Sequence, residues 1–198
     1  MGLLKRYSFF QLITLVFNKI RTIFIFKNAR IIRFPIDIRG KRFINVTKGF
    51  TTGVGCRIEA YPTNNEKVLF FGENFQMNDY VHITAMEHVK IGNNVLLASK
   101  IYISDCSHGS YAGNDNDSSP DSIPHNRKLF SKPITIEDNV WIGESVSVLP
   151  GVTIGKGSII GANSVVSKSI PENVIAVGTP AKPIKKYNFE IKRWEKIN

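Results

Sequence analysis

The most regular pattern in the chain is an aliphatic residue at every sixth position from residue 136 to residue 166. The series consists of Ile136, Ile142, Val148, Ile154, Ile160 and Val166, with a second track at Val140, Val146, Val152, Ser158 and Ser164. A helical stripe recurs every three or four residues and a strand alternates every two, so neither explains this period. A strict six-residue repeat is typical of a solenoid whose short strands each add one core residue before the chain turns a corner.

The same repeat is present upstream, more weakly before residue 82. Its members are Ile44, Phe50 and Cys56, then Leu69, Phe75 and Val81, then Ile83, Val89, Val95 and Ile101, and, two residues out of phase, Ile91, Leu97 and Ile103. Turns in an ordinary β-sandwich would come about 8–12 residues apart, which is too far for this spacing. We therefore predict a mainly β protein, a parallel β-helix of hexapeptide repeats over residues 43–181.

The repeat is interrupted once, because the 33 positions from Ile103 to Ile136 are not a multiple of six. The intervening residues 104–133 are rich in Ser, Asn, Asp, Gly and Pro, and we predict that they form a loop protruding from one corner. Loops of this length within compact folds are usually either functional or disordered. This loop contains His108, the first candidate for chemistry.

The positive charge of the chain lies at its two ends. Of its 198 residues, residues 1–42 contain ten Lys or Arg and one acid, and residues 182–198 contain six and two. Residues 43–181 therefore hold ten basic and thirteen acidic residues, although the whole chain carries +10. A nucleic-acid-binding solenoid would carry a basic face along its body, so this distribution argues against that class. The two cysteines form neither a disulfide framework nor a zinc cluster.

The basic residues 1–42 are predicted to form a helical N-terminal segment. Its longest apolar run, residues 7–17, is shorter than the roughly 20 residues that cross a bilayer, and no signal-peptide cleavage site follows it. Two interpretations remain open: an interfacial helix on an anionic membrane, or a helix that caps the end of the solenoid. Residues 182–198 are predicted to form a short amphipathic helix that closes the other end.

His108 stands where the last strand before the loop ends, a place where an imidazole is accessible to solvent and to a substrate. It can take the proton of a hydroxyl group as that hydroxyl attacks a carbonyl. Asp105, three residues earlier, is expected to orient the imidazole or to stabilise its charged form.

Several motifs between residues 69 and 185 resemble those of the hexapeptide-repeat O-acetyltransferases, such as the galactoside, maltose and surface-polysaccharide enzymes. They are Trp141-Ile142-Gly143, the run LPGVTIG over residues 149–155, Ile160-Gly161-Ala162 and the run VGTPAK over residues 177–182. The resemblance implies a left-handed β-helix, a homotrimer, and acetyl-CoA bound as acyl donor in the groove between neighbouring prisms, without a metal. It also implies that His108 is the general base for transfer to a sugar hydroxyl.

The resemblance also assigns individual positions. It implies that the donor contacts Trp141, Gly143, Gly161, Ala162, Ser167, Lys182 and Lys185, with the two lysines against its phosphates, and that the acceptor contacts Asn78, Asp79, His82 and Tyr111. For Asn78 and Asp79 a corner turn is the alternative interpretation, and for Tyr111 it is an anchor within the loop. Glu144 departs from the small polar residue that the family often has there.

Two other function classes are alternatives. One is a non-catalytic solenoid that serves as a scaffold in a glycan-synthesis complex. The other is a zinc enzyme of the carbonic-anhydrase type, which would need three converging histidines. The favoured prediction is a cytoplasmic O-acetyltransferase of capsule or lipopolysaccharide synthesis, which acts at the inner membrane face if the N-terminal helix binds lipid.

Overall fold

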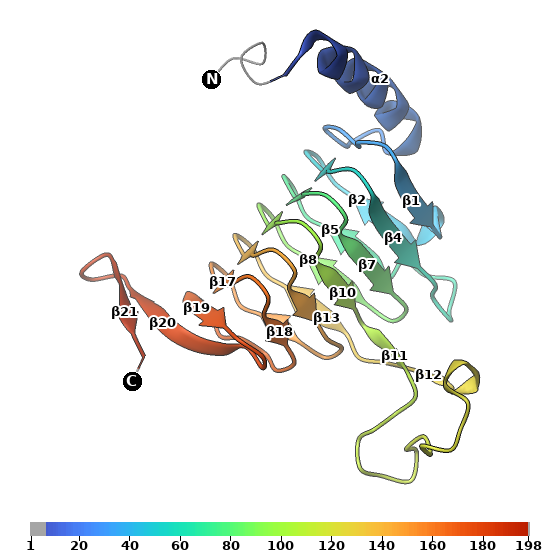
Figure 1. The fold of residues 1–198 in the computed structure, drawn as a ribbon, viewed down its shortest axis with the longest axis vertical. Coiled ribbons are helices and arrows are strands. Elements are labelled where there is room, and N and C mark those ends of the chain that lie inside the picture. Colours follow the sequence, from blue (N-terminus) through green and yellow to red (C-terminus); the bar gives the residue numbers. More distant parts are fainter. Residues whose placement is uncertain (1–6, 198) are drawn as a thin grey trace.

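The chain forms a three-sided parallel β-helix with one N-terminal helix (Figure 1). The computed structural model describes residues 7–197. Face A contains β3 (Thr51–Thr52), β6 (Gln76–Met77), β9 (Leu96–Leu97), β14 (Trp141–Ile142), β17 (Ile159–Ile160), β19 (Val174–Val177), β20 (Lys182–Asn188) and β21 (Arg193–Lys196). Face B contains β1 (Ile36–Arg39), β4 (Cys56–Ala60), β7 (His82–Ala85), β10 (Tyr102–Ser104), β15 (Ser147–Val148) and β18 (Val165–Val166). Face C contains β2 (Ile44–Val46), β5 (Leu69–Phe71), β8 (Val89–Ile91), β13 (Ile134–Ile136) and β16 (Thr153–Ile154).

The predicted hexad residues form the core. Every aliphatic and aromatic member of the predicted series is buried, and successive coils stack in register, as in the pairing of Leu97, Ile142 and Ile160 on face A. The second track changes from valine to serine in its last two members. The buried Ser158 hydroxyl donates to Pro171 O at 2.7 Å and accepts from Val174 N at 3.2 Å, so its burial leaves no polar group unsatisfied.

Asparagine holds one edge of the prism. Asn74, Asn94 and Asn139 follow one another up the corner between faces C and A, each with a positive φ that asparagine adopts more readily than most residues. Their side chains form a ladder, in which Asn74 donates to Asn94 at 3.3 Å and Asn94 donates to Asn139 at 3.2 Å. The same turn is therefore repeated at this corner on three successive coils.

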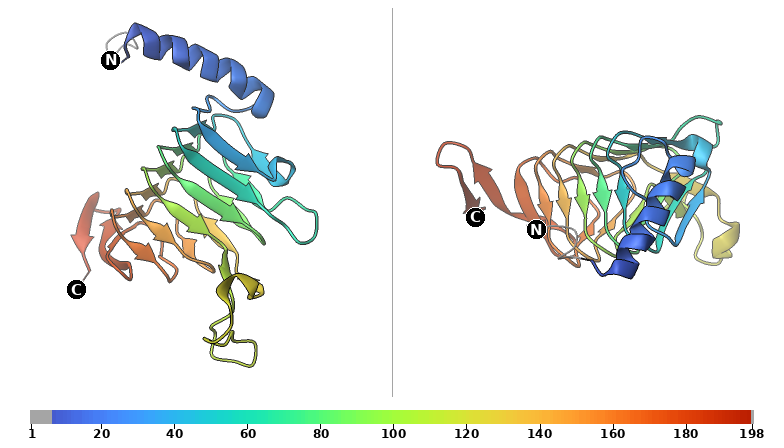
Figure 2. Two further views of the ribbon diagram at one scale, coloured as in Figure 1. Left: turned by 45° about the vertical axis from the view of Figure 1, so that its right-hand side comes forward. Right: turned by 90° about the horizontal axis from the view of Figure 1, so that it is seen from above.

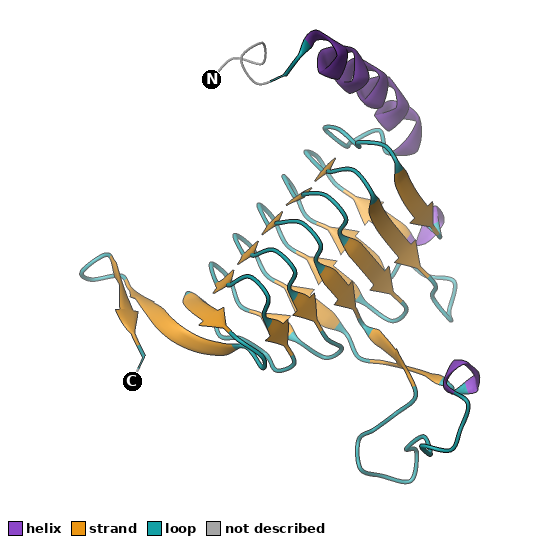
Figure 3. Ribbon diagram, in the orientation of Figure 1, coloured by secondary structure: helices purple, strands orange, loops and turns teal. Residues whose placement is uncertain are grey.

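The interruption at residues 104–133 is an arm with a two-stranded base. It leaves the corner between faces B and C as β11 (Cys106–His108) and returns antiparallel as β12 (Leu129–Ser131), after the short 3-10 helix η2 (Pro124–Asn126) (Figure 3). Arg127 organises the loop, because its guanidinium donates to the Ser122 hydroxyl and carbonyl and to the Tyr111 hydroxyl, each at 2.8 Å.

The C-terminal segment differs from the predicted helix. Residues 182–198 were expected to form a helix, but β20 and β21 form an antiparallel hairpin that continues face A. The last coil ends in β19, which would leave a row of unpaired backbone groups at the edge of the sheet. Pairing β20 against β19 satisfies them, and this outweighs the helical spacing of the side chains.

The N-terminal boundary is also corrected. The helix α2 (Phe9–Ile25) begins in a capping box, in which Ser8 N donates to Gln11 Oε1 at 2.8 Å, and it lies across the end of the prism (Figure 2). The coils begin before residue 43, because β1 pairs with β4 from Ile36 onward and η1 (Lys41–Phe43) precedes β2. No helix among the described residues is long and apolar enough to cross a membrane.

Candidate active site

Face A carries an apolar row on its outer surface. The register places Leu96, Trp141, Ile159 and Ile175 side by side on successive coils, while their neighbours in sequence point into the core. The indole of Trp141 is 49% exposed and Leu96 is 37% exposed. A contiguous apolar row on the outer surface of a solenoid marks a ligand or partner site.

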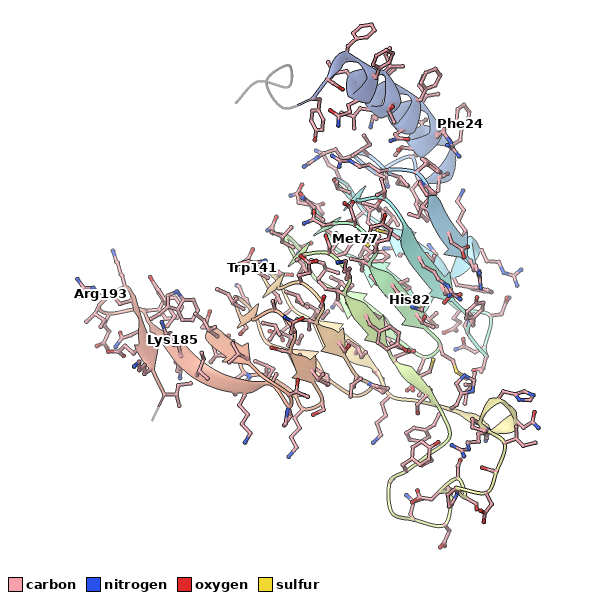
Figure 4. All side chains as sticks on the ribbon, in the orientation of Figure 1. Phe24, Met77, His82, Trp141, Lys185 and Arg193 are labelled. Atoms are coloured by element: carbon pink, nitrogen blue, oxygen red, sulfur yellow. The ribbon has the colours of Figure 1, made fainter. Side chains whose placement is uncertain are left out.

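A β-bulge brings two lysines to the end of this row. Lys182 pairs with Val177 and Lys185 pairs with Ile175, with a register shift between Ile175 and Ala176. Paired residues point to the same side of a sheet, so Lys182 and Lys185 both lie on the outer side. Without the bulge, residues three apart on a strand would face opposite sides. Figure 4 shows Lys185 on the same side of the molecule as Trp141.

The glycines of the predicted donor site have a structural role. A Cβ at Gly143 would lie 2.6 Å from Ala162 N, and one at Gly161 would lie 2.7 Å from Val177 Cγ1. Glycine at these two positions lets adjacent coils stack closely, so the presence of glycine is explained without a ligand. Ala162 is exposed at the corner between faces A and B, whereas Ser167 is exposed at the corner between faces B and C.

His108 lies on the arm and is exposed to solvent. Its backbone pairs with Leu129, and its carbonyl accepts a hydrogen bond of 2.5 Å from the Tyr111 hydroxyl, which in turn accepts one from Arg127. Tyr111 is therefore an anchor within the loop, as the alternative interpretation had it. None of the described side chains forms a hydrogen bond with the His108 imidazole, which leaves the ring open to a substrate.

No hydrogen bond joins Asp105 to His108 among the described residues, so the prediction that Asp105 orients the imidazole was wrong. Its carboxylate is fully buried and accepts hydrogen bonds of 2.8 Å from the backbone N–H groups of Met86, Glu87 and His88. Burial raises the pKa of the Asp105 carboxyl, and the three backbone donors oppose that rise. The three bonds hold the base of the arm against the turn at residues 86–88. Asp105 thus positions the arm as a whole.

The pair Asn78 and Asp79 lies at the corner between faces A and B. Asp79 Oδ1 accepts a hydrogen bond of 2.8 Å from Val54 N, which ties two coils together and supports the interpretation as a corner turn. Asn78 is exposed, and no hydrogen bond joins its side-chain amide to another described residue. Of the two side chains, that of Asn78 is the one available to contact the acceptor substrate.

His82 belongs to a polar cluster on the outer side of face B. The cluster centres on Glu59, whose carboxylate accepts from Arg39 at 3.0 Å, from Arg57, Tyr61 and His82 at 2.8 Å, and from Thr84 at 3.3 Å. Burial alone would raise the pKa of Glu59, but the hydrogen bonds from His82, Arg57 and Tyr61 outweigh it and lower that pKa to about 2. His82 therefore has a charged partner, Glu59, within its own face. The prediction that His82 contacts the acceptor substrate did not include this partner.

The sequence contained a signal for this cluster. Asp37 and Arg39, and then Arg57, Glu59 and Tyr61, alternate with aliphatic residues, as expected for the outer side of two adjacent strands. Their pairing became visible only with the register of β1 and β4.

The structure separates the predicted residues into two groups. Trp141 and the two lysines lie on face A, whereas His108 and Ser167 lie at or beyond the corner between faces B and C. The arm that begins at β11 projects on the side of the prism opposite to Trp141 (Figures 1 and 4). No group of three His, Cys, Asp or Glu residues that could hold a metal ion was found among residues 7–197.

Comparisons with known proteins agree with this architecture. Residues 133–168 match the family model "Bacterial transferase hexapeptide (six repeats)". Over 194 residues the chain is 50% identical to "Putative lipopolysaccharide biosynthesis O-acetyl transferase WbbJ" of Escherichia coli K12, covering 98% of this chain and 97% of that protein. The chain belongs to the hexapeptide-repeat acetyltransferase family.

Other members of the family are similar to this chain over part of its length. A galactoside O-acetyltransferase of Escherichia coli K12 is 39% identical over 64% of this chain and 58% of its own length. A structure of a galactoside acetyltransferase in complex with coenzyme A superposes with a TM-score of 0.54 and 34% identity, covering 75% of this chain and 73% of that one. A Vibrio cholerae hexapeptide-repeat acetyltransferase complexed with acetyl coenzyme A superposes with a TM-score of 0.52 and 28% identity, covering 71% and 72%.

Proposed function

We propose that this acetyltransferase moves the acetyl group of acetyl-CoA to a hydroxyl group of a sugar. The observation that carries the proposal is the apolar outer row of face A, which runs through Trp141, Ile159 and Ile175 and ends at two lysines. The thin apolar pantetheine arm of the donor suits such a row, and its phosphates suit the ammonium groups of Lys182 and Lys185. The coenzyme A complexes of two family members support this choice of donor.

The chemistry that we propose for His108 is general base catalysis. Its neutral imidazole takes the proton of the acceptor hydroxyl while the hydroxyl oxygen attacks the thioester carbonyl. The tetrahedral intermediate collapses, the carbon–sulfur bond breaks, and the thiolate of coenzyme A takes the proton from the imidazolium. The ester is formed on the sugar, and the base returns to its starting state.

We infer that the complete site forms between two copies of the chain. In one copy the arm and Trp141 lie on opposite sides of the prism, so His108 cannot reach a donor on its own face A. A neighbouring copy would bring its arm corner, with His108 and Ser167, against face A. A closed ring of three prisms repeats this contact three times, which fits the homotrimer implied by the family resemblance.

The acceptor that we propose is a precursor of a surface polysaccharide, in a capsule or in lipopolysaccharide. The support is the similarity over nearly the whole chain to a protein whose name places it in lipopolysaccharide biosynthesis. We place the reaction in the cytoplasm, with the acceptor carried by lipid at the inner membrane face.

An acceptor screen tests the reaction. Release of free thiol from acetyl-CoA is followed with free, nucleotide-linked and lipid-linked sugars, and the acetylated product is identified by mass spectrometry. We expect thiol release that depends on a sugar and on His108. Binding of acetyl-CoA with no transfer to any member of the panel would favour a scaffold in a glycan-synthesis complex, the second candidate function.

Subunit mixing tests the composite site. Trp141→Asp places a charge in the apolar row, and His108→Ala removes the base, so each variant alone should be inactive. In randomly mixed trimers about one contact in four pairs an intact arm with an intact face A, so about a quarter of the wild-type activity should return. If the mixture stays inactive while mixed trimers form, each site belongs to a single copy.

A further inference from the structure

The helix α2 is amphipathic, but its polar side faces the coils, whereas a helix that caps a solenoid would bury its apolar side there. Its buried residues are polar, Asn18 and Thr22, and they face the coils. Thr22 Oγ1 accepts a hydrogen bond of 2.8 Å from Ile32 N and donates one of 2.7 Å to Asn18 O. The helix is thus attached to the prism through hydroxyl, amide and backbone groups.

The opposite side of α2 is apolar and exposed. It carries eight large side chains, Phe9, Phe10, Ile13, Val16, Phe17, Ile20, Ile23 and Phe24, each between 38% and 80% exposed. At 100° per residue they fill one continuous arc of roughly 140°, which lies opposite Asn18 and Thr22. Figure 4 shows Phe24 on the side of the helix turned away from the coils. A surface of this size on a soluble fold is an interaction site.

The charge around this arc is of one sign. Residues 1–36 contain seven Lys or Arg and no acid. Two of these cations flank the arc from within α2: Lys19 donates to Arg30 O at 2.7 Å, and Arg21 lies 3.5 Å from the centre of the Phe34 ring. Lys27 and Arg30 follow directly after the helix and are exposed.

We propose that the outward face of α2, the eight apolar side chains with their basic flanks, docks onto an anionic lipid surface. A helix with an apolar face bordered by Lys and Arg lies in the plane of a membrane, with its rings at the boundary between headgroups and acyl chains. A second α2 is a poor alternative occupant, because residues 1–36 would oppose like charges without any acid to pair with them. Docking would hold the prism upright on the membrane, where a lipid-linked acceptor lies.

Vesicle flotation of the full-length protein tests the docking. The probes are vesicles of phosphatidylethanolamine and phosphatidylglycerol, and vesicles of phosphatidylcholine as the neutral reference. We expect the wild-type protein to float with the anionic vesicles, more at low than at high salt. Phe17→Ser with Phe24→Ser, at positions 62% and 80% exposed, should weaken this binding about tenfold or more.

The matched control removes exposed apolar groups elsewhere. Phe189→Ser with Ile191→Ser changes side chains that are 66% and 52% exposed on the loop between β20 and β21, and it should leave flotation unchanged. Sedimentation of the α2 variant should give the wild-type mass. Equal flotation of wild type and α2 variant, no preference for anionic vesicles, or a smaller assembly in the α2 variant would each overturn the proposal; the last would make the face a contact between copies. The assay uses neither acetyl-CoA nor acceptor, so its outcome is independent of the proposed reaction.

Discussion

Faces A and B share one core but differ in what they present outward. On face A the outward row reads Thr51, Gln76, Leu96, Trp141, Ile159 and Ile175, and it is apolar from Leu96 onward. On face B the corresponding row reads Asp37, Arg57, His82, Tyr102, Ser147 and Val165, and it begins beside the buried Glu59. Most inward residues of both faces are aliphatic, with Thr52 and Met77 on face A and Cys56 on face B as exceptions. The difference shows that the repeat specifies the scaffold, while the outward positions are free to specify chemistry.

The two outer rows also differ in how they treat polar groups. Face B satisfies its charges internally, because four of its side chains, together with Tyr61 just beyond the end of β4, form hydrogen bonds with Glu59. Face A leaves its apolar groups uncovered and its lysines near the open end. A surface that has already paired its polar groups is poorly suited to bind a ligand, whereas an uncovered one gains by binding. We therefore expect changes on face A and the arm to affect activity, and changes on face B to affect stability.

The largest effect is expected from the arm. His108→Ala should lower kcat by about 10²–10⁴-fold, because a general base contributes about that much. Affinity for acetyl-CoA, measured by calorimetry, should stay close to that of the wild type. The matched control is His125→Ala, which removes an exposed histidine from η2 of the same arm. An unchanged kcat for His108→Ala would remove this residue from the mechanism.

The next effect concerns the end of face A. Lys182→Ala with Lys185→Ala should weaken binding of acetyl-CoA and of free coenzyme A by about tenfold or more, because two charge-assisted contacts are lost. Lys186→Ala is the control, because Lys186 pairs with Val174 and lies on the other side of β20. If the control weakens binding as much as the double variant, the lysines act through general charge and the bulge has no part in placing them.

On face B we expect a loss of stability. Glu59→Gln should lower the free energy of unfolding by about 2 kcal/mol near neutral pH, since it weakens hydrogen bonds to charged groups, while kcat changes little. The pKa of Glu59 is lowered from 4.5 to about 2 by folding, so its ionised form stabilises the native state above pH 4.5, and this contribution is lost as the pH falls toward 2. Urea unfolding at several pH values should show the two proteins converging over that range. A constant difference between them would contradict the assigned pKa.

The smallest effect is expected at the corner between the two faces. Glu144 lies 3.5 Å from Lys100, and both side chains are more than half exposed. Glu144→Gln should change the free energy of unfolding by less than about 0.5 kcal/mol, because exposed ion pairs contribute little. A marked loss of donor affinity in this variant would show that the corner takes part in the site after all.

Most of the scaffold was predictable from sequence. The hexad residues, the interruption at residues 104–133 and the single N-terminal helix follow from spacing and composition, because each coil places its core residues by local periodicity alone. The C-terminal hairpin did not follow, since its side chains fit a helix as well as a strand and the open edge of β19 decided between them. The prediction that Asp105 orients His108 failed for a similar reason. The three-residue spacing between them does not reveal that the Asp105 carboxylate is bound by a turn at residues 86–88, which lies one coil away.

The sequence by itself determined the period of the core, the family and the residue types available for chemistry, because these depend on identity and spacing along the chain. Only the tertiary structure decided which of those residues share a surface. The bulge beside Ile184 put Lys182 and Lys185 on one side, the register of β1, β4 and β7 gathered charges onto Glu59, and the attachment of α2 turned its apolar side outward. Each of these outcomes depends on pairing between segments that are far apart in sequence, or on which side of an element faces its neighbour, and local spacing specifies neither.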